Sequence, residues 1–180
     1  MSNFPHVETF ENISELESYL QIMKNMVCEV EGLSELDHGL QTAYELELMS
    51  PEDKELQIAG LLHDIAHQQC HIRDHEQYGA RMLEKVMPIR IRELIAQHAN
   101  AKRYLVSVNK TYYDKLTPTS RSSFEDQGGL MSDSEIKAFE QHELRDDLIK
   151  VRVADDLAKT PGRKVHDIEY WLNDLRAVAI

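Results

Sequence analysis

The sequence predicts an all-α fold, a single helical bundle with one long polar loop. Apolar residues recur at helical spacing along almost the whole chain, and the strict alternation of half-buried strands is absent. Helix start and stop signals separate the periodic segments. The 180 residues are enough to build a hydrophobic core, so we expect residues 1–180 to form one domain.

The N-terminal half predicts three helices. The first spans residues 12–31, and the apolar stripe of the second lies within 36–46. The third begins at the sequence SPED, residues 50–53, where a capping serine precedes a proline at the first helical position and two acids favoured by the helix dipole. This third helix carries the sequence GLLHDIAH, residues 60–67.

The C-terminal half predicts five more helices and one loop. The helices are expected over residues 74–86, 89–100, 133–142, 144–159 and 165–178. Ser132 and Glu135 form a capping box, and the Thr-Pro-Gly sequence at 160–162 separates the last two helices. Residues 108–131 combine turn formers, hydroxyl side chains and paired glycines, which predicts a long polar loop with a functional role.

Charge and cysteine content narrow the class of protein. The formal net charge of -12 argues against nucleic acid or an anionic membrane as partner. Cys28 and Cys70 have neither a metal-type spacing nor a disulfide pattern, which is typical of a reducing compartment. We expect no secretory leader, because residues 1–10 lack a basic segment followed by an apolar run, and we find no apolar run of the about 18–20 residues that a membrane span needs. We therefore expect a cytoplasmic protein with no membrane partner.

The sequence GLLHDIAH raises the question of what compensates a buried His–Asp pair. On a helix, His63 and His67 share one face, and Asp64 adjoins His63. Burying such a pair costs several kcal/mol unless a partner replaces the lost water. A metal ion is one such partner. A hydrogen-bonded pair in the core is the alternative, and the dipeptide alone favours neither.

Other residues in the chain favour the metal. His38, His75, His98 and Asp155 all lie on predicted helices, where their side chains can face inward. Imidazole and carboxylate ligands together suit iron, manganese or zinc, whereas calcium prefers oxygen ligands alone. The remaining histidines are expected at the surface or satisfied by hydrogen bonds: His6, His71, His142 and His166.

The order H…HD…H…H…D resembles the HD-domain superfamily, in its six-ligand form that holds two metals. The sequences DHEQYGA, HANAKRYL, LTPTSRSS, DQGG and VRVADDLAK resemble one branch more specifically, the mixed-valent di-iron HD oxygenases of phosphonate degradation. The likeness covers a core of about residues 31–162, between the predicted N-terminal and C-terminal helices. It implies an HD-domain helical bundle.

The resemblance implies two iron ions in a mixed-valent Fe(II)/Fe(III) state, with O2 as co-substrate. The ligands that it implies are His38, His63, Asp64, His75, His98 and Asp155. In that scheme Asp64 bridges the ions, His75 and His98 hold the second ion, and the other three ligands hold the first. A carboxylate neutralised by two cations would account for its burial. Asp156 lies about 100° around the helix from Asp155 and is expected in a supporting or surface position.

A cluster of cations beside the metals would bind an anionic substrate. Lys102 lies four residues after His98, and Arg152 lies three before Asp155, so each is one helical turn from an expected ligand. The resemblance assigns phosphonate binding to His67, Lys102, Ser120 and Arg152, of which His67, Lys102 and Arg152 are the catalytic candidates. Salt bridges with surface acids are the alternative role for the two cations.

The resemblance also indicates how the substrate's other end is recognised. Glu31 matches a family acid near the substrate's amino group, and a solvent-exposed acid is the alternative interpretation. The family has a tyrosine that gates one iron three residues before that acid, but this chain has Cys28 there. The thiol is shorter, and a small buried core residue is its alternative role.

The implied activity is cleavage of the C–P bond of a 1-hydroxy-2-aminoethylphosphonate-type substrate with O2, giving phosphate and an amino acid such as glycine. The alternative is a metal-dependent HD phosphohydrolase that acts on a phosphate ester or nucleotide, because the same ligands can activate water. A third possibility is a non-catalytic sensor, which the six-ligand set disfavours.

Overall fold

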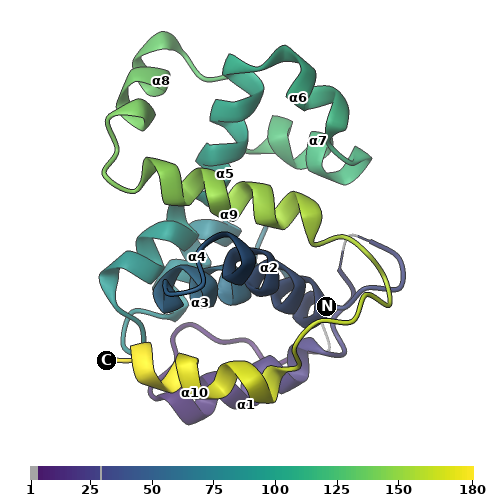
Figure 1. The fold of residues 1–180 in the computed structure, drawn as a ribbon, viewed down its shortest axis with the longest axis vertical. Helices are drawn as coiled ribbons and strands as arrows, with labels where there is room; N and C mark the ends of the chain where they lie inside the picture. The colour runs from purple at the N-terminus through teal and green to yellow at the C-terminus, as the bar shows by residue number, and fades with distance from the viewer. Residues whose placement is uncertain (1–3, 29) are drawn as a thin grey trace.

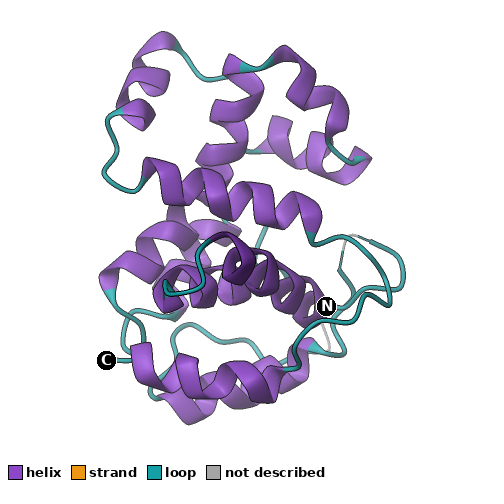
Figure 2. Cartoon of the chain, viewed as in Figure 1, coloured by secondary structure: helices purple, strands orange, loops and turns teal. Residues whose placement is uncertain are grey.

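The computed structural model describes residues 4–28 and 30–180, and within these ranges the regular elements are helices (Figures 1 and 2). They are α1 (Ile13–Met23), α2 (Glu35–Met49), α3 (Lys54–Leu62), α4 (His75–Met82), α5 (Ile89–Val108), α6 (Lys110–Lys115), α7 (Pro118–Asp126), α8 (Asp133–Glu140), α9 (Arg145–Leu157) and α10 (Ile168–Val178). The described strand-type pairing is a single antiparallel bridge between Val27 and Ser34. The all-α class is confirmed.

The expected long polar loop over residues 108–131 is wrong, because most of it is helical. Helix α5 continues to Val108, and α6 and α7 follow at once. The Asn109 side chain accepts a hydrogen bond from the Thr111 N–H, and Thr117 does the same for Ser120, with Pro118 at the first helical position. The turn-forming residues that suggested a loop are therefore the caps of two short helices.

Three helix boundaries in the N-terminal half also differ from expectation: the start of α3, the end of α3 and the end of α1. The side chain of Asp53 caps α3, whereas Ser50 ends α2 by donating its backbone N–H to Leu46. Helix α3 ends at Leu62, so only the first three residues of GLLHDIAH are helical. From residue 63 the chain continues in tight turns, in which the N–H groups of Ile65, His67 and Gln69 each bond to the carbonyl three residues back. The N-terminal helix, expected over 12–31, ends at Met23.

Helix α9 crosses the middle of the molecule and separates two groups of helices (Figure 1). Below it in this view lie α1 to α4 and α10, and above it lie α6 to α8, while α5 passes behind and contacts both α4 and α9. The main hydrophobic core joins buried residues from Phe10 to Leu175. A second small cluster of Val106, Leu116 and Phe124 stabilises the α6–α7 pair.

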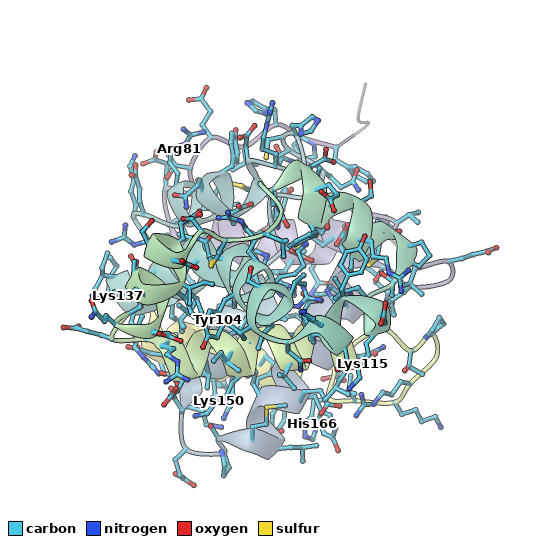
Figure 3. All side chains as sticks on the ribbon, turned by 90° about the horizontal axis from the view of Figure 1, so that it is seen from above. Arg81, Tyr104, Lys115, Lys137, Lys150 and His166 are labelled. Carbon is cyan, nitrogen blue, oxygen red and sulfur yellow. The ribbon has the colours of Figure 1, made fainter. Side chains whose placement is uncertain are left out.

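The upper group of helices is attached to α5 partly through aromatic packing. Tyr104 of α5, near the middle of the view in Figure 3, stacks on Phe139 of α8 with ring centroids 4.5 Å apart. Lys137, which also belongs to α8, lies at the margin of that view. No helix within the described ranges is both long and apolar enough to cross a membrane.

Two glycines let α2 and α3 approach closely enough to bring their histidines together. A Cβ atom on Gly39 would lie 2.5 Å from the backbone carbonyl oxygen of Leu61. A Cβ atom on Gly60 would lie 2.4 Å from the Cδ1 atom of Leu46. Both distances are shorter than packed atoms tolerate. The glycines therefore fix the spacing of the two helices that carry His38 and lead into His63.

Alanine substitution at the helical glycines should destabilise the protein in a defined order. Gly39→Ala should lower the free energy of unfolding by about 3 kcal/mol, because the added Cβ atom would force the backbone of Leu61 to move. Gly60→Ala should cost less, since it displaces the end of a flexible leucine. In Gly79→Ala the added Cβ atom would lie 3.3 Å from the Ile65 Cγ2 atom, and alanine has the higher helix propensity, so the free energy of unfolding should change little. Urea denaturation of the three variants measures the order, and equal losses would contradict the close-approach argument.

Candidate active site

Asp64 lies at the centre of five histidines, and its two oxygen atoms face different ones. Its Oδ2 atom is 3.4 Å from His38 Nε2 and 3.2 Å from His63 Nε2. Its Oδ1 atom is 3.2 Å from His67 Nε2, 3.3 Å from His75 Nε2 and 3.6 Å from His98 Nε2. One buried carboxylate thus divides the imidazoles into two sets.

The six expected ligands come from four helices and one turn, and they meet in this cluster. His38 comes from α2, His75 opens α4, His98 lies on α5 and Asp155 on α9. His63 and Asp64 follow the end of α3, where the tight turn directs their side chains inward. All six are buried.

Four of the histidines are held by the same local arrangement. Each donates its Nδ1–H to a backbone carbonyl, because a carbonyl oxygen can only accept. The acceptors are Ala158 for His38, Gly60 for His63, Ile72 for His75 and Ile95 for His98, at 2.9, 2.8, 2.5 and 2.7 Å. This fixes the tautomer and leaves each Nε2 atom with a lone pair facing the cluster, as in metal-ligating histidines.

The Nε2 atoms need a cation between them. Those of His75 and His98 are 3.1 Å apart, and two lone pairs at that distance repel unless a proton or a metal ion lies between them. The Nε2 atom of His63 is buried and has no hydrogen-bond partner among the described residues. A buried polar atom left without a partner is costly. These donor atoms therefore fit metal ions.

Protonation satisfies some of these rings at the expense of others. Burial lowers the pKa of His38, but hydrogen bonds with Asp155 and Asp64 outweigh burial and raise this pKa well above its usual value. Burial and the neighbouring charge of His75 hold the pKa of His98 well below its usual value. Burial opposes ionisation of Asp64, but the charges of His63 and His67 hold its pKa well below the usual range. A proton on one imidazole thus disfavours a proton on the next.

Among residues 4–28 and 30–180, two sets of side chains have ligand atoms close enough to share an ion. One set is His38, His63 and Asp155, and the other is Asp64, His67 and His75, each with its ligand atoms within 4.8 Å of one another. The second set includes His67, which the sequence assigned to substrate binding. Imidazole nitrogen and carboxylate oxygen together suit iron, manganese or zinc.

A small polar cavity opens beside the cluster. Its volume is about 30 Å³, and it is lined by Asp64, His67, Ile72, His75, His98, Lys102, Ser120, Ser123, Gln127, Arg152, Asp155 and Lys159. The Lys102 ammonium donates to Ser123 Oγ at 2.7 Å. Burial, with the neighbouring charge of Arg152, lowers the pKa of Lys102 to about 8. Lys102 and Arg152 therefore line one cavity, as their helical spacing predicted.

Arg152 is held among acidic and phenolic groups. Its side chain is 3% exposed, and its Nη1 atom donates to Asp155 Oδ2 at 2.6 Å. The rest of the guanidinium contacts both carboxylate oxygens of Asp156 and the Tyr112 hydroxyl. Tyr112 also donates to Asp156. Asp156 thus faces Arg152 rather than the histidine cluster, and α6 reaches the site through Tyr112.

Glu31 is the one expected site residue that the fold leaves outside. It is exposed and does not line the cavity. Glu35, one turn later, is instead 3% exposed, and its Oε1 atom lies 3.4 Å from His67 Nδ1. Its Oε2 atom is buried without a hydrogen-bond partner in the described part of the chain. Cys28 is buried, and burial raises the pKa of its thiol to about 11, so the thiol stays protonated.

Several residues of the site were missed by sequence reasoning. They are Glu35, Tyr112, Ser123, Gln127 and Lys159. Helical spacing offered a signal for two of them, because Glu35 lies three residues before His38 and Lys159 lies four after Asp155. The four histidines expected to lie elsewhere are outside the cavity lining, and two of them face acids, His142 with Glu93 and His166 with Glu47.

Comparison with known proteins shows what this chain is similar to. The HD-domain family profile matches residues 36–160. The chain is 37% identical over 158 residues to hydroxymethylphosphonate dioxygenase of Gimesia maris, covering 82% of this chain and 78% of that protein. It is 31% identical over 151 residues to the glycine-betaine-forming [1-hydroxy-2-(trimethylamino)ethyl]phosphonate dioxygenase of Leisingera caerulea, covering 78% of this chain and 76% of that protein.

The HD-domain match spans the segments that carry all six expected ligands, and with the two relatives it confirms the resemblance to HD-domain phosphonate dioxygenases. The chain belongs to the HD-domain family.

Proposed function

We propose that this protein is a cytoplasmic di-iron oxygenase that cleaves the C–P bond of a small 1-hydroxyphosphonate with O2. The observation that carries the proposal is the position of Asp64 between two sets of imidazoles, beside a cavity lined by cationic side chains. The kinship with two phosphonate dioxygenases supports the oxygenase class.

The proposed metal ligands are those that the sequence indicated. His38, His63 and Asp155 would hold one iron, His75 and His98 would hold the other, and Asp64 would bridge them. His67 lies as close to Asp64 as these histidines do, so it would border the second iron. When bound, the irons supply the one-electron and O2 chemistry that amino-acid side chains lack.

The protein's own contribution is to bind and orient the substrate. Lys102 and Arg152 would attract the phosphonate, and the Ser120 hydroxyl and the His67 ring would complete its hydrogen bonds. Fixing the phosphonate end positions the neighbouring carbon and its hydroxyl against the histidine cluster. Lys102 and Arg152 are buried, so their contacts with an anion are screened less by water than contacts at the surface would be.

The proposed substrate is of the 1-hydroxy-2-aminoethylphosphonate type, with phosphate and an amino acid such as glycine as products. The 1-hydroxyphosphonate unit is also part of the substrate names of both relatives, and these differ at the other end of the molecule. Glu31, first assigned to the amino end, is exposed. Glu35 is the buried acid next to His67, and it becomes our candidate for that end.

Removing Asp64 should remove both metals. Asp64→Ala deletes the bridge and leaves the charges of both ions uncompensated, so the variant should contain almost no iron. A metal present at 100 times its dissociation constant stabilises a folded protein by about 2.7 kcal/mol, and the variant should lose this gain. Elemental analysis and thermal melts with added Fe(II) measure both effects. The control is His142→Ala, outside the cluster, which should keep both metals.

Phosphate release should require O2. The iron-loaded protein should consume O2 and release phosphate from 1-hydroxy-2-aminoethylphosphonate or hydroxymethylphosphonate. Equal release under argon would contradict the oxygenase proposal and favour the hydrolase alternative, as would turnover of phosphate monoesters or nucleotides with manganese. An O2 electrode and a phosphate assay on the same sample distinguish the outcomes.

Activity should fall in alkali as Lys102 loses its proton. Burial and the charge of Arg152 lower the Lys102 pKa to about 8, and bound irons would lower it further, so the ammonium is present at lower pH and is lost as the pH rises through this pKa. The value of kcat/KM reports the free enzyme and should therefore fall about tenfold per pH unit above this pKa. Lys102→Met should have a lower kcat/KM without this alkaline fall. The substrate's own ionisation affects both proteins equally, so identical profiles would exclude Lys102 as the titrating group.

A further inference from the structure

The contact between Glu35 and His67 sets His67 apart from the other four histidines around Asp64. Each of those four donates its Nδ1–H to a backbone carbonyl. In the described part of the chain His67 has no such carbonyl, and its Nδ1 atom lies 3.4 Å from the Glu35 Oε1 atom instead. Its Nε2 atom lies 3.2 Å from Asp64 Oδ1, and its side chain lines the cavity. The direction of the His67 ring therefore depends on a side chain and not on the backbone.

Among the described residues, His67 is the ion-pair partner that accounts for the burial of Glu35. Glu35 is 3% exposed, and its charge adds to burial in raising the pKa values of two neighbours, Tyr19 to about 12 and Cys28 to about 11. Both neighbours therefore stay protonated and supply no positive charge. A buried carboxylate without a partner would cost several kcal/mol. The imidazole of His67 is the group that can offset this cost.

The backbone that carries Glu35 is held by contacts outside the cavity. The Glu35 N–H donates to the Met26 carbonyl at 2.8 Å, and the residue before it, Ser34, forms the antiparallel bridge with Val27. Glu35 opens α2, where the helix dipole favours an acid. The dipole alone does not require burial, since Asp37 in the same turn is exposed. The buried position of Glu35 is therefore better explained by its contact with His67.

We propose that Glu35 is a positioning residue for His67: its Oε1 atom accepts the Nδ1–H and so directs Nε2 toward the phosphonate group in the cavity. This inference rests on the proposed function for the identity of the anion that His67 contacts. At 3.4 Å the contact is longer than a usual N–H···O bond, and active-site contacts of this kind commonly tighten when the ligand binds. The Oε2 atom, buried without a hydrogen-bond partner in the described part of the chain, is left for the substrate's amino end.

Calorimetry of methylphosphonate binding to the iron-loaded protein under argon tests this role without turnover. Methylphosphonate has no amino group, so it reports the phosphonate contacts and not the amino end. Glu35→Gln and Glu35→Leu both remove the negative charge, but only glutamine keeps an oxygen that can accept from His67. Glu35→Gln should therefore bind within about threefold of the wild-type protein and Glu35→Leu about tenfold more weakly, which is the size of coupling expected between residues in contact.

A double-mutant cycle separates positioning of His67 from a structural role. In the His67→Ala background, Glu35→Gln and Glu35→Leu should bind methylphosphonate equally, because the ring that Glu35 positions is gone. The matched control is Glu45→Leu. Glu45 is a buried acid of the same helix, but it pairs with Arg163 and does not line the cavity, so this variant should bind as the wild-type protein does. Iron content and melting temperature are measured on every variant, and Glu35→Met replaces Glu35→Leu if the latter does not fold.

Equal binding by Glu35→Gln and Glu35→Leu with His67 present would overturn the proposal, as would a difference between them that persists without His67. A wild-type protein that does not bind methylphosphonate would contradict both this inference and the proposed function. The oxygenase proposal can also fail alone. If the two variants differ as expected but the wild-type protein releases no phosphate with O2, the oxygenase assignment is wrong and the positioning role of Glu35 stands.

Discussion

The structure depends on one buried carboxylate whose two oxygens face different sets of imidazoles. Asp64 contacts His38 and His63 through one oxygen, and His67, His75 and His98 through the other. Without cations, this arrangement would bury a negative charge among nitrogen lone pairs, at a cost of several kcal/mol. Two shared metal ions would offset that cost by neutralising the carboxylate and occupying the lone pairs.

The fold serves this cluster by controlling backbone positions. Gly39 and Gly60 allow close packing of α2 against α3, so that His38 meets the turn that carries His63. The end of α3 at Leu62 frees the Gly60 carbonyl to accept from His63, and Ala158, at the end of α9, accepts from His38. Unsatisfied carbonyls at helix ends thus become the groups that orient the metal-facing rings. Helix α7 then lines the cavity with the hydroxyl groups of Ser120 and Ser123, and α6 supplies the Tyr112 hydroxyl that contacts Arg152.

The sequence predicted the parts of this design that have a local period or a motif. The all-α class followed from apolar periodicity, and the positions of Lys102 and Arg152 followed from their one-turn spacing to His98 and Asp155. The region 108–131 was misread because Asn109, Thr117 and Pro118 signal both loops and helix starts, and only tertiary packing distinguishes the two. Glu35 and Lys159 each lie about one helical turn from an expected ligand, but this spacing alone did not single them out, because their contacts are with His67 and Ser120, which are distant in sequence.

The central claim is that Asp64 joins two metal ions in one centre. EPR spectroscopy of the anaerobically purified, iron-loaded protein, before and after adding a 1-hydroxyphosphonate, tests this claim most directly. Two irons that share a carboxylate are magnetically coupled. The account therefore predicts a coupled mixed-valent signal that changes when the substrate binds beside it. The signal of isolated iron, unchanged by substrate, would contradict the account.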